Sequence, residues 1–310
     1  MDDGDVIHVN RRGFRGAEID PTTPDDVVRI VVLGGSQVFD WEGNWPRKLE
    51  TELRRSGIES KVINAGVPGH DTADSLGKLL NDVWMLEPRV VILANCWNDL
   101  KCFSLIDPSD PYRGLPPARP ESWQPDWRIY PTGLDAILSI SALYRKQRWW
   151  LASFLYHEEG ASRIPQGEIG SSSAGTDAWG VRQYRLNVEM MAEASRLIGA
   201  ELVLLSQAKL LSPAATGPGQ ERAPDYGRRL TGLEPAELQA AFETCYEQLE
   251  QVAVGRGLRM IDMDAELSGV DEYYIDGIHF TEAGSHAAAR VVSETIVPLL
   301  QTAGGVPARE

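Results

Sequence analysis

Short apolar runs recur along the chain and alternate with stretches whose apolar positions follow the period of an α-helix. The runs are rich in Val, Ile and Leu, and they do not alternate strictly between apolar and polar positions. This pattern is typical of strands buried on both faces of a parallel sheet. We expect five such strands, at residues 28–34, 60–66, 89–95, 201–207 and 258–263.

Amphipathic helical patterns separate these strands. In the first of them, Leu49 and Leu53 fall on one face at helical spacing. The last begins near Thr281, which is the expected N-cap. Regular alternation of strand and helix predicts a three-layer α/β/α sandwich around an open parallel sheet of about five strands. We expect the helices at 42–56, 71–86, 180–198, 234–255 and from Thr281 onward.

Polar, proline-rich stretches break this alternation. An aromatic-rich helical pattern at 134–156 lies inside the first of them. We favour packing of that pattern on the sheet, although a lid or a partner surface would have the same composition. Loops of this length in a compact domain are usually functional or disordered. The expected organisation is a lead-in at 1–27, a single domain at 28–302 with insertions at about 104–179 and 212–231, and a flexible tail at 303–310.

Composition narrows the classes of function. The net charge of −15 argues against nucleic acid or an anionic membrane as a partner, since both require clustered Lys and Arg. The acidic N-terminal stretch has no apolar core of a signal peptide, and no stretch approaches the roughly 18 apolar residues of a membrane helix. The three cysteines have no metal-type spacing and are expected to be free thiols. These features favour a cytoplasmic protein, although a secreted protein without its leader would look similar.

Ser36 follows the first strand directly, within the stretch VVLGGSQVFD. Serine after glycine is common in ordinary turns, so a role as nucleophile requires a base and an orienting acid. Asp276 and His279 in YYIDGIHFTEAGSH are candidates for the acid and the base. Taken alone, an Asp and a His near a helix start are more often a helix cap and a surface residue.

Two further motifs follow strands. The stretch NAGVPGHD places Gly66 where its backbone N–H can approach a ligand, and NCWND places the Asn98 amide where it can stabilise an oxyanion. Each is also compatible with a simple turn. Because the carboxyl ends of parallel strands meet at one edge of a sheet, we expect Ser36, Gly66 and Asn98 to converge there with the Asp276–His279 pair.

These four ordered motifs resemble those of the SGNH (GDSL-type) hydrolase family. The upstream NRRGFRGAEI resembles a lead-in of its G-G-S subgroup, and Gly35 stands where the commoner motif has Asp. The resemblance implies a flavodoxin-like fold, no cofactor or metal, and hydrolysis of esters or thioesters through an acyl-serine. It implies Ser36 as nucleophile, His279 as base and Asp276 as the residue that orients it. The oxyanion donors would be the N–H groups of Ser36 and Gly66 and the side chain of Asn98.

The expected activity is therefore hydrolysis of a small-molecule or carbohydrate ester with a short acyl group, such as acetyl. An acyltransferase would use the same residues, and a catalytically inactive binding module would keep the same fold. Trp41 and Trp97 lie beside the motif residues and are expected to contact substrate, for example by stacking on a sugar ring. Neutral His279 is required as the base, so activity should fall below roughly pH 6.

Overall fold

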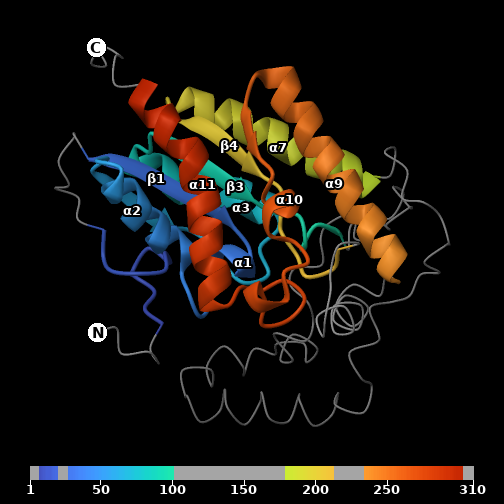
Figure 1. Ribbon diagram of the computed structural model, residues 1–310. Helices are drawn as coiled ribbons and strands as arrows, with labels where there is room; N and C mark the ends of the chain where they lie inside the picture. The colour runs from blue at the N-terminus through green and yellow to red at the C-terminus, as the bar shows by residue number, and fades with distance from the viewer. Residues whose placement is uncertain (1–6, 20–26, 101–178, 213–233, 303–310) are drawn as a thin grey trace, which may run out of the picture. The chain divides into compact units, whose positions relative to one another are not determined.

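The computed structural model describes residues 7–19, 27–100, 179–212 and 234–302, and Figure 1 draws the other residues as a grey trace. The two expected insertions and the expected C-terminal tail fall on ranges outside the described residues. The same is true of the aromatic-rich pattern at 134–156.

Five parallel strands form one sheet, as predicted. The strand order is β2-β1-β3-β4-β5. The register aligns Gly34 at the end of β1 with Ala94 at the end of β3, so the segments after these two strands begin side by side. The direction of winding reverses between β1 and β3, which is where ligands bind in open sheets of this type. The strands are β1 (Val28–Gly34), β2 (Ser60–Asn64), β3 (Val90–Ala94), β4 (Glu201–Leu205) and β5 (Arg259–Ile261).

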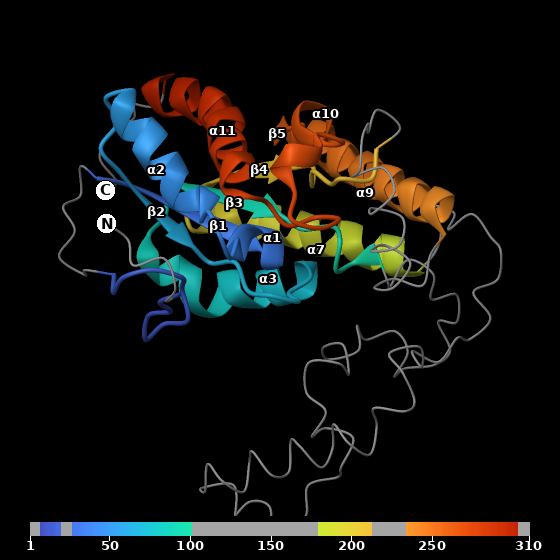
Figure 2. The same ribbon diagram turned by 60° about the horizontal axis from the view of Figure 1, so that its bottom comes forward.

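Helices cover both faces of this sheet. On β1, Val31 and Leu33 face one hydrophobic cluster while Ile30 and Val32 face the other, so the strand is buried on both sides. Figure 2 shows α2 and α11 on one side of the sheet, and α3 and α7 on the other. The predicted α/β/α sandwich is therefore confirmed. The first side carries α2 (Trp45–Arg55) and α11 (Glu282–Thr302), and the second carries α3 (Thr72–Lys78), α7 (Trp179–Leu197) and α9 (Pro235–Arg256).

The helix expected at 71–86 differs from the expected one, and β2, β4 and β5 each end two residues earlier than expected. The helix expected at 71–86 is α-helical only over α3 and continues as a π-helical turn, η1 (Leu79–Val83), and a 3₁₀ turn, η2 (Trp84–Leu86). The last strand ends at Ile261 because the side chain of Asp262 accepts a hydrogen bond from Ala265 N–H and caps a short helix, α10 (Met263–Leu267). The final helix begins as predicted, with Thr281 Oγ1 accepting the Gly284 N–H at 3.2 Å.

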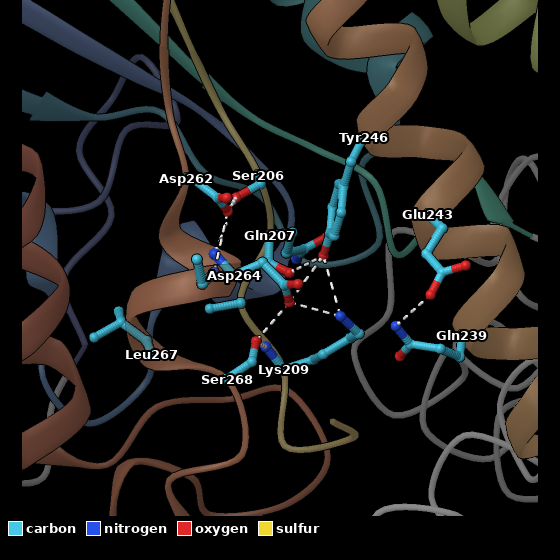
Figure 3. Close-up of polar contacts among 12 residues, drawn as sticks. Ser206, Gln207, Lys209, Gln239, Glu243, Tyr246, Asp262, Asp264, Leu267 and Ser268 are labelled. Atoms are coloured by element: carbon cyan, nitrogen blue, oxygen red, sulfur yellow. Dashed lines mark hydrogen bonds and ion pairs between the residues drawn. The ribbon is translucent and has the colours of Figure 1, made fainter. Parts of the chain in front are cut away.

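A buried polar cluster fastens the chain after β4 to α9 and α10 (Figure 3). Lys209 is 1% exposed, and its Nζ lies 2.6 Å from Asp264 Oδ1 and 4.5 Å from the centre of the Phe242 ring. Ser268 Oγ donates to the same carboxylate oxygen at 2.6 Å. The neighbouring Gln207 Oε1 accepts the backbone N–H of Trp97 at 2.6 Å. The cluster therefore reaches the segment that follows β3.

None of the helices in the described ranges combines the length and hydrophobicity needed to cross a membrane.

Candidate active site

Three side chains from distant parts of the sequence form a continuous hydrogen-bonded chain. Ser36 begins a four-residue helix, α1 (Ser36–Phe39), directly after β1. Its Oγ lies 2.8 Å from His279 Nε2, and His279 Nδ1 lies 2.7 Å from Asp276 Oδ2. The structure thus brings together the serine, the histidine and the aspartate that the sequence analysis singled out.

The loop before α11 explains why the D-x-x-H spacing produces this contact. Asp276 Oδ1 accepts the backbone N–H groups of Ile278 and His279, both at 2.9 Å. The Ile275 N–H donates to the His279 carbonyl at 2.9 Å, and Tyr274 pairs with Phe280 as an antiparallel bridge. One carboxylate oxygen therefore closes the turn, while the other is left to bind the imidazole.

The environment of Asp276 keeps this carboxyl group ionised. Partial burial raises its pKa, but the hydrogen bonds from the His279 side chain and from the His279 and Ile278 N–H groups outweigh that effect. The pKa is therefore below its ordinary value. An ionised carboxylate only accepts hydrogen bonds, so the ring nitrogen that faces it, Nδ1, carries the proton. In neutral His279 the other nitrogen, Nε2, is then free to accept the hydroxyl proton of Ser36.

Gln37, which the sequence analysis did not single out, holds the loops that carry Ser36 and His279 together. Its side chain is buried, and Nε2 donates to the carbonyl groups of Ala208 and Ile278, both at 2.7 Å. Ile278 precedes His279, and Gln37 follows Ser36. A single amide group thus links the turn that carries Ser36 to the loop that carries His279 and to the segment after β4.

Asn98 lies against the nucleophile turn, as expected. Its Nδ2 donates to the carbonyl group of His70 at 2.8 Å, which uses one of the two amide hydrogens. A Cβ atom on residue 35 would lie 2.6 Å from this Nδ2 and 3.1 Å from the His70 carbonyl oxygen. Glycine at position 35 therefore allows the Ser36, His70 and Asn98 loops to meet.

Gly66 does not fit the expected role of oxyanion donor. Its N–H donates to Asn64 Oδ1 at 3.0 Å, and a Cβ atom there would lie 2.4 Å from the Phe39 backbone nitrogen. The residue instead allows the chain after β2 to pass close to α1. Its N–H group is engaged within its own turn by the Asn64 side chain.

Gly69, in the same motif, differs from Gly66 in its backbone conformation. It occupies the left-handed region at φ +85° in a turn closed by the hydrogen bond from His70 N–H to Val67 O at 3.0 Å. The carbonyl group of His70 is the one that holds Asn98. No acceptor for the Gly69 N–H is found among the described residues. The Pro-Gly pair at the centre of VPGH is the sequence signal for this turn.

The two tryptophans expected to contact substrate have different surroundings. Trp41 is 36% exposed, and its ring lies edge-on to His279 at a centroid distance of 5.2 Å. Trp97 is buried, and its ring packs at 5.7 Å from Phe242 on α9. Trp97 therefore packs in the core, where its backbone N–H donates to Gln207 Oε1, and its expected contact with substrate stays a prediction.

The cysteine beside Asn98 is not a second nucleophile. Cys96 is buried, and burial raises the pKa of its thiol well above the ordinary value. A thiol held in this state is a poor nucleophile. Within the described ranges, no group of three or more His, Cys, Asp or Glu side chains is arranged to hold a metal ion.

Known proteins resemble this chain in their structures and not in their sequences. No family model and no curated protein sequence matches the chain. The structure is similar to that of a lipase/acylhydrolase from Enterococcus faecalis, with 17% identity, a TM-score of 0.50 and coverage of 88% of this chain and 97% of the other. It is also similar to that of a candidate GDSL-like lipase from Parabacteroides merdae, with 11% identity, a TM-score of 0.50 and coverage of 88% and 96%. Together with the strand order, these similarities show that the chain has the fold of the SGNH, or GDSL-type, hydrolases.

Proposed function

We propose that the chain is a serine hydrolase that cleaves a carboxylic ester through an acyl-serine intermediate. The observation that carries this proposal is the unbroken set of hydrogen bonds from Ser36 through His279 to Asp276. The order of the four sequence motifs and the SGNH-type fold support the same activity. Ser36 is the proposed nucleophile, His279 the base and Asp276 the residue that orients the base.

In the first half of the reaction, Ser36 Oγ attacks the ester carbonyl carbon while His279 Nε2 takes the hydroxyl proton. The carbonyl π electrons move onto the oxygen as the new C–O bond forms. Asp276 stabilises the imidazolium. We assign the oxyanion to the N–H of Ser36, the free amide hydrogen of Asn98 and the N–H of Gly69, with Gly69 taking the role first expected of Gly66.

The tetrahedral intermediate then collapses. The bond to the alcohol oxygen breaks, and His279 returns its proton to that oxygen, so that the neutral alcohol leaves and the acyl-serine remains. Water attacks the acyl carbon with His279 again as the base, which releases the carboxylic acid and restores Ser36. Transfer to an alcohol would use the same residues and would differ only in the acceptor, so product analysis separates the two.

For the substrate, we propose a small-molecule or carbohydrate ester with a short acyl group. Trp41 is 36% exposed and lies edge-on to His279, so it offers an aromatic surface to the part of the substrate nearest the base. The names of the similar structures, a lipase/acylhydrolase and a GDSL-like lipase, are consistent with an acyl ester.

Labelling with a fluorophosphonate probe, read by intact mass, tests the nucleophile. We expect one adduct on the wild-type protein, mapped to Ser36, and none on Ser36→Ala. The matched control is Ser56→Ala, which removes an exposed serine at the end of α2 and should label like wild type. An adduct that persists on Ser36→Ala, or no adduct on folded wild-type protein, would overturn the proposal.

A further inference from the structure

The N-terminal segment 7–19 is anchored beside the proposed active site. Phe14 is buried, and Arg15 forms an antiparallel bridge with Asn64 at the end of β2, with its N–H donating to the Asn64 carbonyl at 3.0 Å. A second bridge joins Val9 to Arg15 within the segment. The backbone of Arg15 is therefore fixed at the sheet edge where the site lies.

The side chain of Arg15 holds both sides of the loop that follows α1. Its guanidinium group donates to the carbonyl groups of Phe39 and, at 3.2 Å, of Trp41. It also lies 5.2 Å from the centre of the Phe39 ring. Between these two residues, Asp40 turns the chain with φ +51°. The planar fork of an arginine can bind two carbonyl groups at once, which a lysine cannot do in the same way.

The loop held by Arg15 presents Trp41 to His279. The Trp41 ring packs edge-on against Phe39 at 5.3 Å and against His279 at 5.2 Å, with an interplanar angle of 90° to the imidazole. Arg15, Phe39, Trp41 and His279 thus form one contiguous set of contacts. It links a segment before β1 to the loop before α11.

We propose that Arg15 is a positioning residue, which fixes Trp41 against His279 and thereby limits the orientations of the imidazole. The catalytic part of this inference rests on the proposed function. The structural part, the dependence of the Trp41–His279 contact on Arg15, does not. The motif NRRGFRGAEI contains none of the triad residues, and this proposal gives the N-terminal segment a role in shaping the site.

The NMR signal of the His279 Hε1 proton tests the structural part. The Trp41 ring shifts this signal by its ring current, so Trp41→Ala should move it toward the position of an exposed histidine. We expect Arg15→Ala to move it in the same direction and Arg15→Lys to move it by a smaller amount. Arg12→Ala, which removes an exposed arginine from the same segment, should leave it in place. An unchanged signal in Arg15→Ala would overturn the proposal.

A double-mutant cycle on kcat/KM tests the catalytic part. We expect Arg15→Ala and Trp41→Ala each to lower kcat/KM by about tenfold, because small misplacements of a catalytic group are costly. The double variant should be no slower than Trp41→Ala alone, since Arg15 acts through Trp41. A double variant whose loss of kcat/KM is the product of the two single losses would overturn the proposal.

If Arg15→Ala fails to fold, Arg15→Lys is used for both measurements. Absence of labelling on Ser36 in wild type would instead count against the proposed function, and the NMR result would still decide the role of Arg15.

Discussion

At the scale of single residues, the chemistry of the site depends on side chains that fix the loops as much as on those that react. Asp276 uses one oxygen to close its own turn and the other to orient His279. Gln37 uses both amide hydrogens to join the nucleophile turn to the histidine loop. The 2.8 Å contact between Ser36 and His279 therefore depends on groups other than the two that make it.

Replacing Gln37 by methionine should separate positioning from reaction. The variant keeps the length of the side chain but leaves the carbonyl groups of Ala208 and Ile278 without their donor, at a cost of about 1–3 kcal/mol each. Because the two loops lose their link, we expect kcat/KM and the rate of fluorophosphonate labelling to fall by about 10- to 100-fold. Gln251→Met, at an exposed position on α9, is the control. Equal labelling rates for Gln37→Met and wild type would show that the link is dispensable.

At the scale of elements, a buried carboxylate joins α2 to α11 next to the site. Asp40 accepts the backbone N–H of Trp45 at 2.7 Å and the hydroxyl of Ser285 on α11 at 2.6 Å. Burial raises the pKa of Asp40, while these hydrogen bonds oppose that effect by favouring the ionised form. The hydrogen bonds to Asp40 therefore matter most for stability when this carboxyl group is charged, because the buried charge is then stabilised by the groups that donate to it.

Ser285→Ala should reveal this dependence. At neutral pH the loss of a hydrogen bond to a buried charge should lower the free energy of unfolding by about 1.5–3 kcal/mol. Because the pKa of Asp40 is raised in the folded state, its ionisation costs stability above that pKa, and the cost declines as the pH falls from there toward the lower pKa of the unfolded chain. The variant raises the pKa further, so its deficit should shrink at acidic pH. Urea unfolding across this range measures the effect.

The control for that measurement lies on the same helix. Ser293 Oγ donates to the Arg290 carbonyl within α11, so Ser293→Ala should give a small deficit that does not change with pH. A deficit of Ser285→Ala that stayed constant from neutral to acidic pH would contradict the assignment of this bond to the charged form.

Most of the fold was predictable from the sequence, and the exceptions have local causes. The strands have continuous apolar runs because most of their residues are buried, completely so in β3, which leaves a clear signal. Asp262 was not predictable as the end of β5, since its role as a cap depends on the helix that follows. Gly66 and Gly69 lie in one motif, and the sequence did not show that the Gly66 N–H binds Asn64 while Gly69 takes a left-handed conformation. The burial of Trp97 depends on Gln207, which is distant in sequence.

At the scale of the whole molecule, two hydrophobic layers enclose the sheet, and polar clusters join the segments that leave its carboxyl edge. One such cluster centres on Lys209, which is almost fully buried and pairs with Asp264 (Figure 3). Through Gln207 it also holds the backbone of Trp97, next to Asn98. The half of the sheet formed by β4 and β5 is thereby coupled to the half that carries Ser36.

Lys209→Met should destabilise the whole fold. Removing one partner of a buried ion pair costs about 3–5 kcal/mol, because the remaining charge loses its compensation. The double variant Lys209→Met, Asp264→Leu removes both charges and should recover part of that loss. Thermal and urea unfolding of the single and double variants measures the difference. A double variant that is as unstable as the sum of its single changes would show that the two groups are not coupled.

The hydroxyl of Ser36 and the imidazole that binds it stand 243 positions apart in the sequence. The serine turn is complete once β1 and its neighbours have formed, but the histidine arrives with the last loop to be synthesised before α11. A ribosome-bound chain that has completed the first half of the sheet therefore carries an unactivated alcohol, however well ordered its turn is. Under the proposed function, reactivity appears only when that final loop docks, so covalent labelling of Ser36 would report the completion of folding as well as catalytic competence.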